Sequence, residues 1–244
     1  MPDSSQNALR SQLDPIDAKS IDRILEDAAQ TPSERQAIRQ LLEDDTERFH
    51  LLDQTFFQEI ILAAGNEIDA SLVCFVRVRS KLLTAGIRNL KTAIYLTHVW
   101  LNYREKGILP ENGLSEGPVI ETVDILKELN FLNGYEKFEL LTMSGNYYLF
   151  LMAFFEDYFH ELEIQHGRPN AAYYEAFARI SFRAARDHGL SEEFDLMDVC
   201  DDLSENFAVI KSAISELNDP KAKTISDHEV IPDWDKSPAP TPST

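Results

Sequence analysis

Residues 140–155 read LLTMSGNYYLFLMAFF, the longest run of this chain without a charged side chain. Three small or polar residues, Ser144, Gly145 and Asn146, lie inside the run, and Glu156 ends it. A membrane-spanning helix needs about 20 predominantly apolar residues. We therefore interpret the run as the central buried helix of a soluble protein, a helix that is apolar on all its faces because other helices surround it.

Two helix start signals occur in the N-terminal part of the chain, well before this run. Asp14-Pro15-Ile16-Asp17 and Thr31-Pro32-Ser33-Glu34 each combine an N-cap residue, a proline at the first helical position and a carboxylate at the third. This is the capping-box pattern, in which side chain and backbone satisfy each other at the first turn. None of the eleven prolines falls inside a segment with helical periodicity, where it would break the helix.

Glycines mark the expected helix ends, because the left-handed conformation that closes a helix costs glycine least. Five of the nine glycines follow periodic segments: Gly65, Gly107, Gly134, Gly167 and Gly189. Between these marks the sequence predicts helices near 15–29, 32–64, 67–85, 90–106, 118–133, 135–166, 171–188 and 192–217.

Three of these segments carry further detail. The second helix is expected to break at 44–46, and the sixth at 144–145. Residues 73–80, VCFVRVRS, alternate in part like a strand, but no partner strand is visible, and we predict a helix there. The last segment has the clearest pattern, a 4-3 spacing typical of a helix packed in a bundle. Its apolar positions are Leu196, Cys200, Leu203, Phe207, Ile210, Ile214 and Leu217.

The predicted fold class is therefore all-α, a single multi-helix bundle of about eight helices. The bundle is expected to occupy residues 14–218, after a flexible N-terminus of residues 1–13. Residues 219–244 contain five prolines and end in a run rich in Ser and Thr. Such a segment cannot bury enough apolar surface to offset the entropy of ordering it, so we predict a disordered C-terminal tail.

Composition excludes several classes of function. The net charge of −19 disfavours nucleic acid and anionic membranes, because both require clustered Lys and Arg. Cys74 and Cys200 are the only cysteines, they are far apart, and they lack the spacing of zinc ribbons or redox motifs. The N-terminus shows neither a basic leader nor an apolar core typical of a signal peptide. We expect a cytoplasmic protein with no cofactor, whose oligomeric state the sequence leaves open.

The stretch FEDYFHELEIQH (155–166) contains the most chemistry. Glu163/His166 has the Glu-x-x-His spacing of di-iron carboxylate bundles, and Glu47/His50 supplies a second such pair. Single carboxylates would come from Glu121, Asp124 or Glu175. The other interpretation is that these residues form the solvated edge of an amphipathic helix, with His166 near the helix C-terminus. We prefer the second interpretation and expect no metal site.

Two resemblances to known proteins bear on function. DQTFFQEIILAAGN (53–66) is similar to the metal-binding stretch of GntR-type regulators, but Phe57 replaces the ligating histidine of that stretch, and no activity is transferred. GNYYLFLMAFFEDYF (145–159), followed by YYEAFARISFRAA (173–185), resembles a family of uncharacterised bacterial all-helical proteins. The second resemblance implies a helical domain over about residues 70–210 and carries no activity. We expect its aromatic residues to pack in the core.

Two segments could meet protein partners. Residues 191–205 carry seven acidic side chains and no basic one, so they form either a solvated face or, as the weaker alternative, a dock for a basic partner. In the tail, Val230, Ile231 and Trp234 lie within acidic surroundings. They either pack back onto the bundle or form a short motif for another protein.

The favoured function is a non-enzymatic one, regulation or scaffolding through protein–protein contact. The alternative is a di-iron-like oxidoreductase using Glu47/His50 and Glu163/His166.

Overall fold

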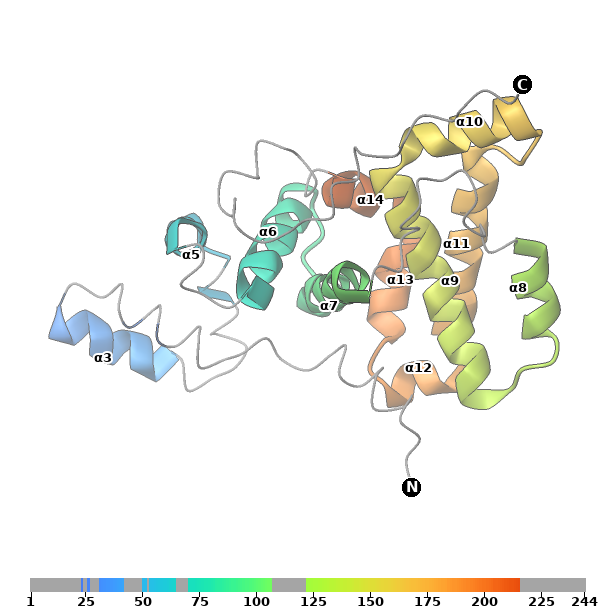
Figure 1. Ribbon diagram of the computed structural model, residues 1–244. Coiled ribbons are helices and arrows are strands. Elements are labelled where there is room, and N and C mark those ends of the chain that lie inside the picture. The colour runs from blue at the N-terminus through green and yellow to red at the C-terminus, as the bar shows by residue number, and fades with distance from the viewer. Residues whose placement is uncertain are drawn as a thin grey trace.

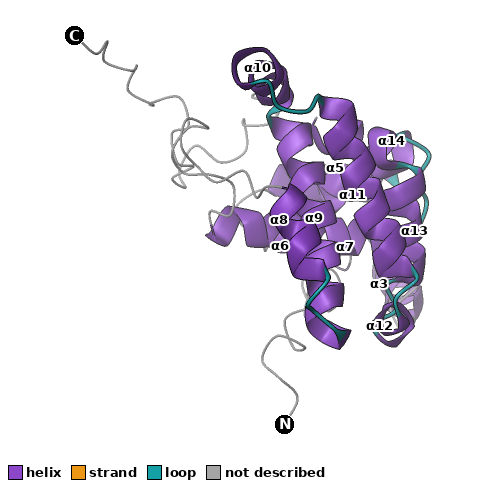
Figure 2. Ribbon diagram, turned by 90° about the vertical axis from the view of Figure 1, so that its right-hand side faces the viewer, coloured by secondary structure: helices purple, strands orange, loops and turns teal. Residues whose placement is uncertain are grey.

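The computed structural model describes residues 23, 26, 31–41, 50–51, 53–64, 70–106 and 122–215. In these residues the fold is all-α, as predicted, and Figure 2 shows helices and loops without a strand in the same parts of the chain. The helices are α3 (Pro32–Leu41), α5 (Thr55–Ala64), α6 (Ala70–Thr84), α7 (Leu90–Lys106), α8 (Thr122–Leu129), α9 (Gly134–Phe154), α10 (Glu156–His166), α11 (Ala171–Arg186), α12 (Gly189–Glu193), α13 (Met197–Glu205) and α14 (Phe207–Ser215).

Helix α9 is the central element of the bundle, in agreement with the interpretation of residues 140–155. Every residue from Ser144 to Ala153 is buried. Helix α11 packs along α9, and α13 packs on the other side of α11, as the order of the three helices in Figure 2 shows. The pair α6 and α7 joins this group through α13 and α14, and α5 packs on α6. One continuous apolar core, from Ile61 to Ile214, connects all these helices.

The predicted break at Ser144-Gly145 is wrong, and the reason lies in local bonding and packing. The hydroxyl of Ser144 donates to the carbonyl of Leu140 at 2.6 Å, so the polar group is satisfied within the helix. A Cβ atom on Gly145 would lie 2.6 Å from the ring of Phe182 in α11. The glycine therefore lets two helices approach closely. The helix ends instead at Phe155, whose φ of −133° and ψ of 50° are not helical, and α10 begins there.

Two other predicted helices are also divided. The segment 32–64 contains α3 and α5, with a turn at residues 53–54 before α5. The segment 192–217 contains α13 and α14, which meet at Asn206, and α12 precedes them. The predicted seam is nevertheless buried at each of its described positions: Leu196, Cys200, Leu203, Phe207, Ile210 and Ile214.

The helix end signals succeeded in two places and failed in two, the first being Gly134, which begins α9 instead of closing α8. At α3 the backbone N–H of Thr31 donates to Glu34, and the N–H of Glu34 donates to the Thr31 hydroxyl, which is the predicted capping box. Gly167 closes α10 with a left-handed φ of 60°. Gly189 does not close a helix, because His188 accepts from the N–H of Leu190 and caps the start of α12.

Residues 73–80 are helical within α6, and a buried arginine that the sequence pattern concealed lies there. Arg79 is only 2% exposed. Its guanidinium donates to both carboxylate oxygens of Asp53 at 2.7 and 2.8 Å, and to the carbonyl of Arg88 at 2.8 Å. This bidentate pair connects the turn before α5 with α6 and with the α6–α7 turn.

No helix in the described part of the chain is long and apolar enough to cross a lipid bilayer. The N-terminal segment 1–13 and the tail 219–244 lie outside the described residues, together with Val230, Ile231 and Trp234.

Candidate docking groove

An open groove lies where α8 and α11 diverge over α9. Its volume is about 850 Å³. Leu141 of α9, together with Phe177 and Ser181 of α11, lines it with buried side chains. The hydroxyl of Ser181 donates to the carbonyl of Phe177, so this polar group is satisfied within its own helix. The floor therefore offers an apolar surface.

The walls of the groove expose large apolar side chains to solvent. Leu126 of α8 is 49% exposed, and Tyr173 and Ile180 of α11 are 40% and 61% exposed. On α11 these two residues lie seven positions apart, with Ala176 and Ala184 on the same line. Residues at that spacing share one helix face. Helix α11 thus carries a second apolar stripe, beside the stripe that packs on α9.

The two ends of the groove differ in chemistry. At the end where α8 and α11 begin, the hydroxyls of Thr122 and Tyr173 are hydrogen-bonded at 2.8 Å, and this contact ties the two helices together. At the other end lie Asn130, Lys137 and His188. The Asn130 amide donates to the carbonyl of Leu126, and the His188 ring caps α12.

Lys137 supplies a positive charge at that second end. It belongs to the first turn of α9, where helix N–H groups also present positive potential. It forms no ion pair with any residue that the structure describes, while Asp187, the acidic residue of the lining, is paired with Arg186 at 2.9 Å. The groove therefore combines apolar walls with a cation, Lys137, that no described residue neutralises.

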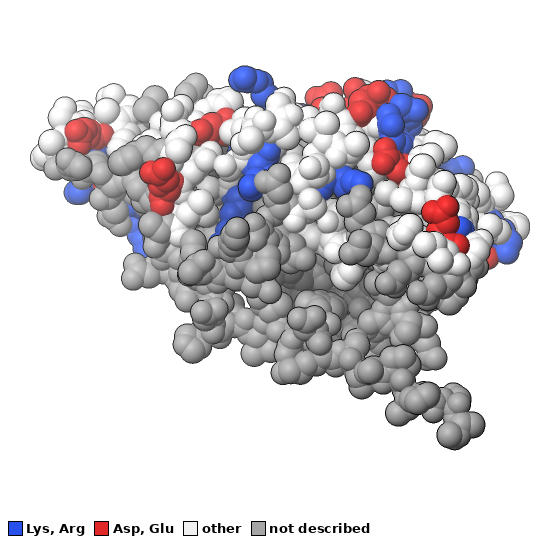
Figure 3. Space-filling view, turned by 90° about the horizontal axis from the view of Figure 1, so that it is seen from above, with Lys and Arg blue, Asp and Glu red and all other residues white. Residues whose placement is uncertain are grey.

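The acidic segment 191–205 is neutralised in part by the chain itself, through ion pairs of Asp195, Asp201 and Glu205. Asp195 pairs with Lys91 at 2.7 Å, and Asp202 accepts from the hydroxyl of Thr92. On the face of the molecule seen in Figure 3, acidic and basic side chains are interspersed and lie against each other at the upper right. The net charge of the chain is thus not gathered into one acidic patch on that face.

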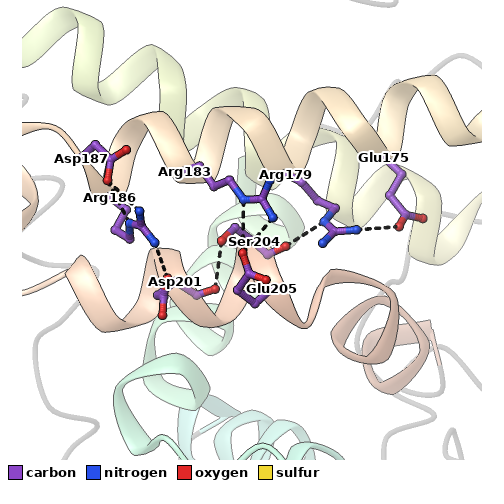
Figure 4. Close-up of polar contacts among 8 residues, drawn as sticks. All are labelled: Glu175, Arg179, Arg183, Arg186, Asp187, Asp201, Ser204 and Glu205. Carbon is purple, nitrogen blue, oxygen red and sulfur yellow. Dashed lines mark hydrogen bonds and ion pairs between the residues drawn. The ribbon is translucent and has the colours of Figure 1, made fainter.

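Three arginines on α11 contact α13, and two of them form ion pairs with this segment. Figure 4 shows Arg179, Arg183 and Arg186 pointing from α11 toward α13. Arg183 donates to Glu205 at 2.8 Å, and Arg186 donates to Asp201 at 2.7 Å. Arg179 donates to the carbonyl of Ser204 at 2.8 Å. We call this set the arginine ladder. The contacts between α11 and α13 thus account for the spacing of these basic residues along α11.

The candidate metal ligands are only partly described. Glu47, Glu121 and the side chain of His166 lie outside the described residues. His50 lies 3.5 Å from Asp53, which belongs to the pair with Arg79. Figure 1 shows α5, which follows His50, and α10, which contains Glu163, on opposite sides of the bundle.

The remaining carboxylates proposed for a metal site have other partners. Asp124 pairs with Lys127 at 2.9 Å, and Glu175 lies 4.0 Å from Arg179. Among the described residues no group of three or more His, Cys, Asp or Glu side chains could hold a metal ion. The di-iron alternative therefore stays a prediction that no described contact supports.

Most of the aromatic residues behind the family resemblance pack in the core as expected. Tyr147, Tyr148, Phe150 and Tyr174 are all buried. Tyr173 departs from the expectation, because its ring lies in the groove wall. Tyr173 and Ile180 lie seven positions apart and form an apolar stripe on α11. This stripe is the sequence signal that could have identified Tyr173 as a groove residue.

A polar cluster lies inside the core near α9. The amide of Asn146 donates to the hydroxyl of Tyr95 at 2.7 Å. Burial raises the pKa of Tyr95 and of Tyr103, and it raises the pKa of Tyr147 to about 12. Burial likewise raises the pKa of the Cys200 thiol to about 12. These groups stay protonated and neutral at physiological pH, as buried groups in a packed core do.

Comparisons of the chain with family models, with curated proteins and with solved structures found no match.

Proposed function

We propose that this chain is a non-enzymatic, cytoplasmic protein that acts through protein–protein contact, and that the groove between α8 and α11 is its receptor surface. The observation that carries the proposal is the solvent exposure of Leu126, Tyr173 and Ile180 around a groove with an apolar floor. Contiguous exposed apolar surface of this kind is typical of interaction sites in soluble proteins.

The chemistry of the groove indicates its partner. The walls fit an apolar peptide segment, which would be held mainly by burial of its side chains. The uncompensated charge of Lys137 at one end favours acidic residues flanking that segment. The partner is therefore a protein with an apolar segment next to Asp or Glu, bound in an extended or helical form.

The proposal can be tested with a dodecamer peptide library displayed on phage and selected on the full chain. We expect enrichment of sequences with two or three large apolar residues beside acidic ones. A fluorescein-labelled synthetic copy of the most enriched peptide then measures affinity by fluorescence anisotropy. Ile180→Glu should weaken its binding about tenfold or more, because a buried apolar contact of about 1.4 kcal/mol corresponds to a factor of ten.

Val209→Glu is the matched control for this experiment. Val209 on α14 is 42% exposed and does not line the groove. The substitution adds the same charge at a similarly exposed apolar position, so we expect binding to be unchanged. A peptide that binds Ile180→Glu as tightly as the unsubstituted chain would overturn the proposal. A selection without enrichment would also overturn it.

A further inference from the structure

We infer that the groove has an internal ligand, the tail segment Glu229-Val230-Ile231-Pro232-Asp233-Trp234-Asp235, which docks in cis and competes with outside partners. This inference rests on the proposed function, because it names the first occupant of the same receptor surface. Three properties of the chain support it: the reach of the tail, the length of the groove, and the match in charge and apolar character.

The tail is long enough to reach the groove. The described chain ends at Ser215 on α14, which packs on α9, the helix that also forms the groove floor. Residues 216–228 provide a linker of 13 residues, which spans about 45 Å when extended. Because α9 itself is only about 30 Å long at 1.5 Å per residue, the linker can pass around it.

The segment also matches the groove in length. The groove follows α11 from Tyr173 to Asp187, a distance of about 21 Å along a helix. Seven extended residues cover about 23–25 Å. Pro232 favours the polyproline conformation, in which residues three apart, such as Ile231 and Trp234, face the same side. Two large apolar side chains would then enter the groove together.

The charges are complementary as well. Residues 227–235 contain four carboxylates and neither Lys nor Arg. The groove offers Lys137, whose charge no described residue neutralises. An acidic apolar segment therefore gains both burial and Coulomb attraction in this groove, where a basic segment would meet repulsion.

Tethering makes even weak docking effective. A short flexible linker gives an effective concentration on the order of 1 mM. A segment with a Kd of about 100 μM would then occupy the groove about 90% of the time. Removing the segment should make the groove about tenfold more available to an outside peptide.

Fluorescence of Trp234 in the full chain tests docking without any outside ligand. Trp100 is first replaced by Phe, which keeps a ring against its aromatic neighbours Phe150 and Phe154. We expect a blue-shifted emission and weak quenching by iodide. Ile180→Glu, which weakens docking about tenfold, should raise the iodide-accessible fraction about fivefold, from about 10% to about 50%. Val209→Glu should leave it unchanged.

Disulfide trapping locates the contact and separates cis from trans docking. The full chain carrying Ile180→Cys and Ile231→Cys should form an intrachain disulfide under mild oxidation, because Cys74 and Cys200 are buried and do not compete. The pair Val209→Cys with Ile231→Cys should not. A disulfide that forms only between two chains, at a rate that depends on concentration, would overturn docking in cis.

The outcomes separate this inference from the proposed function. Ile231→Asp should raise the affinity of the selected peptide about tenfold, whereas Ala239→Asp, which adds the same charge outside the segment, should not. If Trp234 is fully quenched in every variant while the peptide still requires Ile180, the inference fails and the receptor groove stands. If the peptide does not require Ile180, the proposed function fails, whatever the behaviour of Trp234.

Discussion

Helix α11 takes part in two seams that differ in how completely they are filled. Against α9, Gly145 removes a side chain so that the ring of Phe182 lies directly on the helix backbone, and Phe182 is fully buried. Against α8, two positions away along the sequence, Ile180 is 61% exposed and the space beside it is open. One seam is packed, and the other is left unfilled.

An apolar helix face therefore does not by itself determine whether a residue belongs to the core. Ile180 and Phe182 are similar in character, and what separates them is the presence or absence of an opposing side chain. A protein that only needed stability would gain by filling the α8–α11 seam, since burial of a large apolar side chain is worth about 1.5–3 kcal/mol. The open seam beside the packed one therefore supports the proposed receptor surface.

The largest expected effect on the free energy of unfolding comes from weak acids of the packed core, three tyrosines and one cysteine, that are buried. Tyr147 and Cys200 titrate at about 12 in the folded chain, against 10.0 and 9.0 ordinarily, and Tyr95 and Tyr103 are also raised. Their stability contribution is complete below about pH 9 and is lost as the pH rises toward 12, because the unfolded chain releases these protons first. Each fully shifted group lowers the free energy of unfolding by about 1.4 kcal/mol per pH unit.

Urea unfolding followed by circular dichroism between pH 8 and 11 measures this loss. We expect the combined loss of unfolding free energy between pH 8 and 11 to be on the order of several kcal/mol. A free energy of unfolding that stays constant up to pH 11 would show that these tyrosines are accessible to solvent. The core around them would then be no better packed than the open α8–α11 seam.

The second prediction is a double-mutant cycle at the packed seam. Phe182→Ala should cost about 3–5 kcal/mol of unfolding free energy. Gly145→Ala should cost about 1–3 kcal/mol, because its Cβ overlaps the ring. In the Phe182→Ala background the same Gly145→Ala change should become favourable by about 0.5–1 kcal/mol, the helix propensity of alanine over glycine. Additive costs would show that the ring does not lie on Gly145.

The third prediction concerns the buried Arg79. Asp53→Ala should destabilise the chain by about 3–5 kcal/mol, because it leaves a buried guanidinium without its carboxylate. Replacing both partners, with Arg79→Met and Asp53→Ala, should recover much of this loss because no buried charge remains. Thermal unfolding of the three variants checks the order. Equal losses in the single and double variants would contradict the buried ion pair.

The smallest effect on stability is expected from the arginine ladder. The pair Arg183–Glu205 is about half exposed on both sides, and exposed ion pairs contribute about 0–1 kcal/mol. Glu205→Gln should therefore lower the melting temperature only slightly, and the difference should disappear in about 1 M salt, where the Debye length is about 3 Å. A large loss that survives high salt would mean that the ladder, like the α9–α11 seam, is packed away from water.

Periodicity and end signals predicted much of the fold. The bounds of α7 agree with the predicted 90–106, and the capping box at Thr31 and the left-handed Gly167 lie where expected. These features depend on neighbours within one turn, which a sequence displays directly. The continuity of α9 through Ser144-Gly145 was not predictable in this way, because it involves the close approach of Phe182, a residue of α11 far away in the sequence.

The groove was missed for a related reason. The sequence suggested the acidic segment 191–205 and the tail as partner surfaces, and the Glu-x-x-His pairs as an alternative. Pairing with the arginine ladder accounts for part of that acidic segment, and it joins residues 15 to 25 positions apart along the chain. The exposure of Leu126 and Ile180 depends on which helices pack against α8 and α11, a tertiary property that helical periodicity does not encode.

The most direct measurement of the central claim is a methyl NMR titration of the full chain with the selected dodecamer peptide. We expect the methyl signals of Ile180 and Leu126, which line the open seam, to shift or broaden on binding. The methyl signals of Val209, which is also exposed but lies on α14, should stay in place. Shifts that gather around Val209, or a peptide that binds without moving the signals of Ile180 and Leu126, would contradict a receptor surface between α8 and α11.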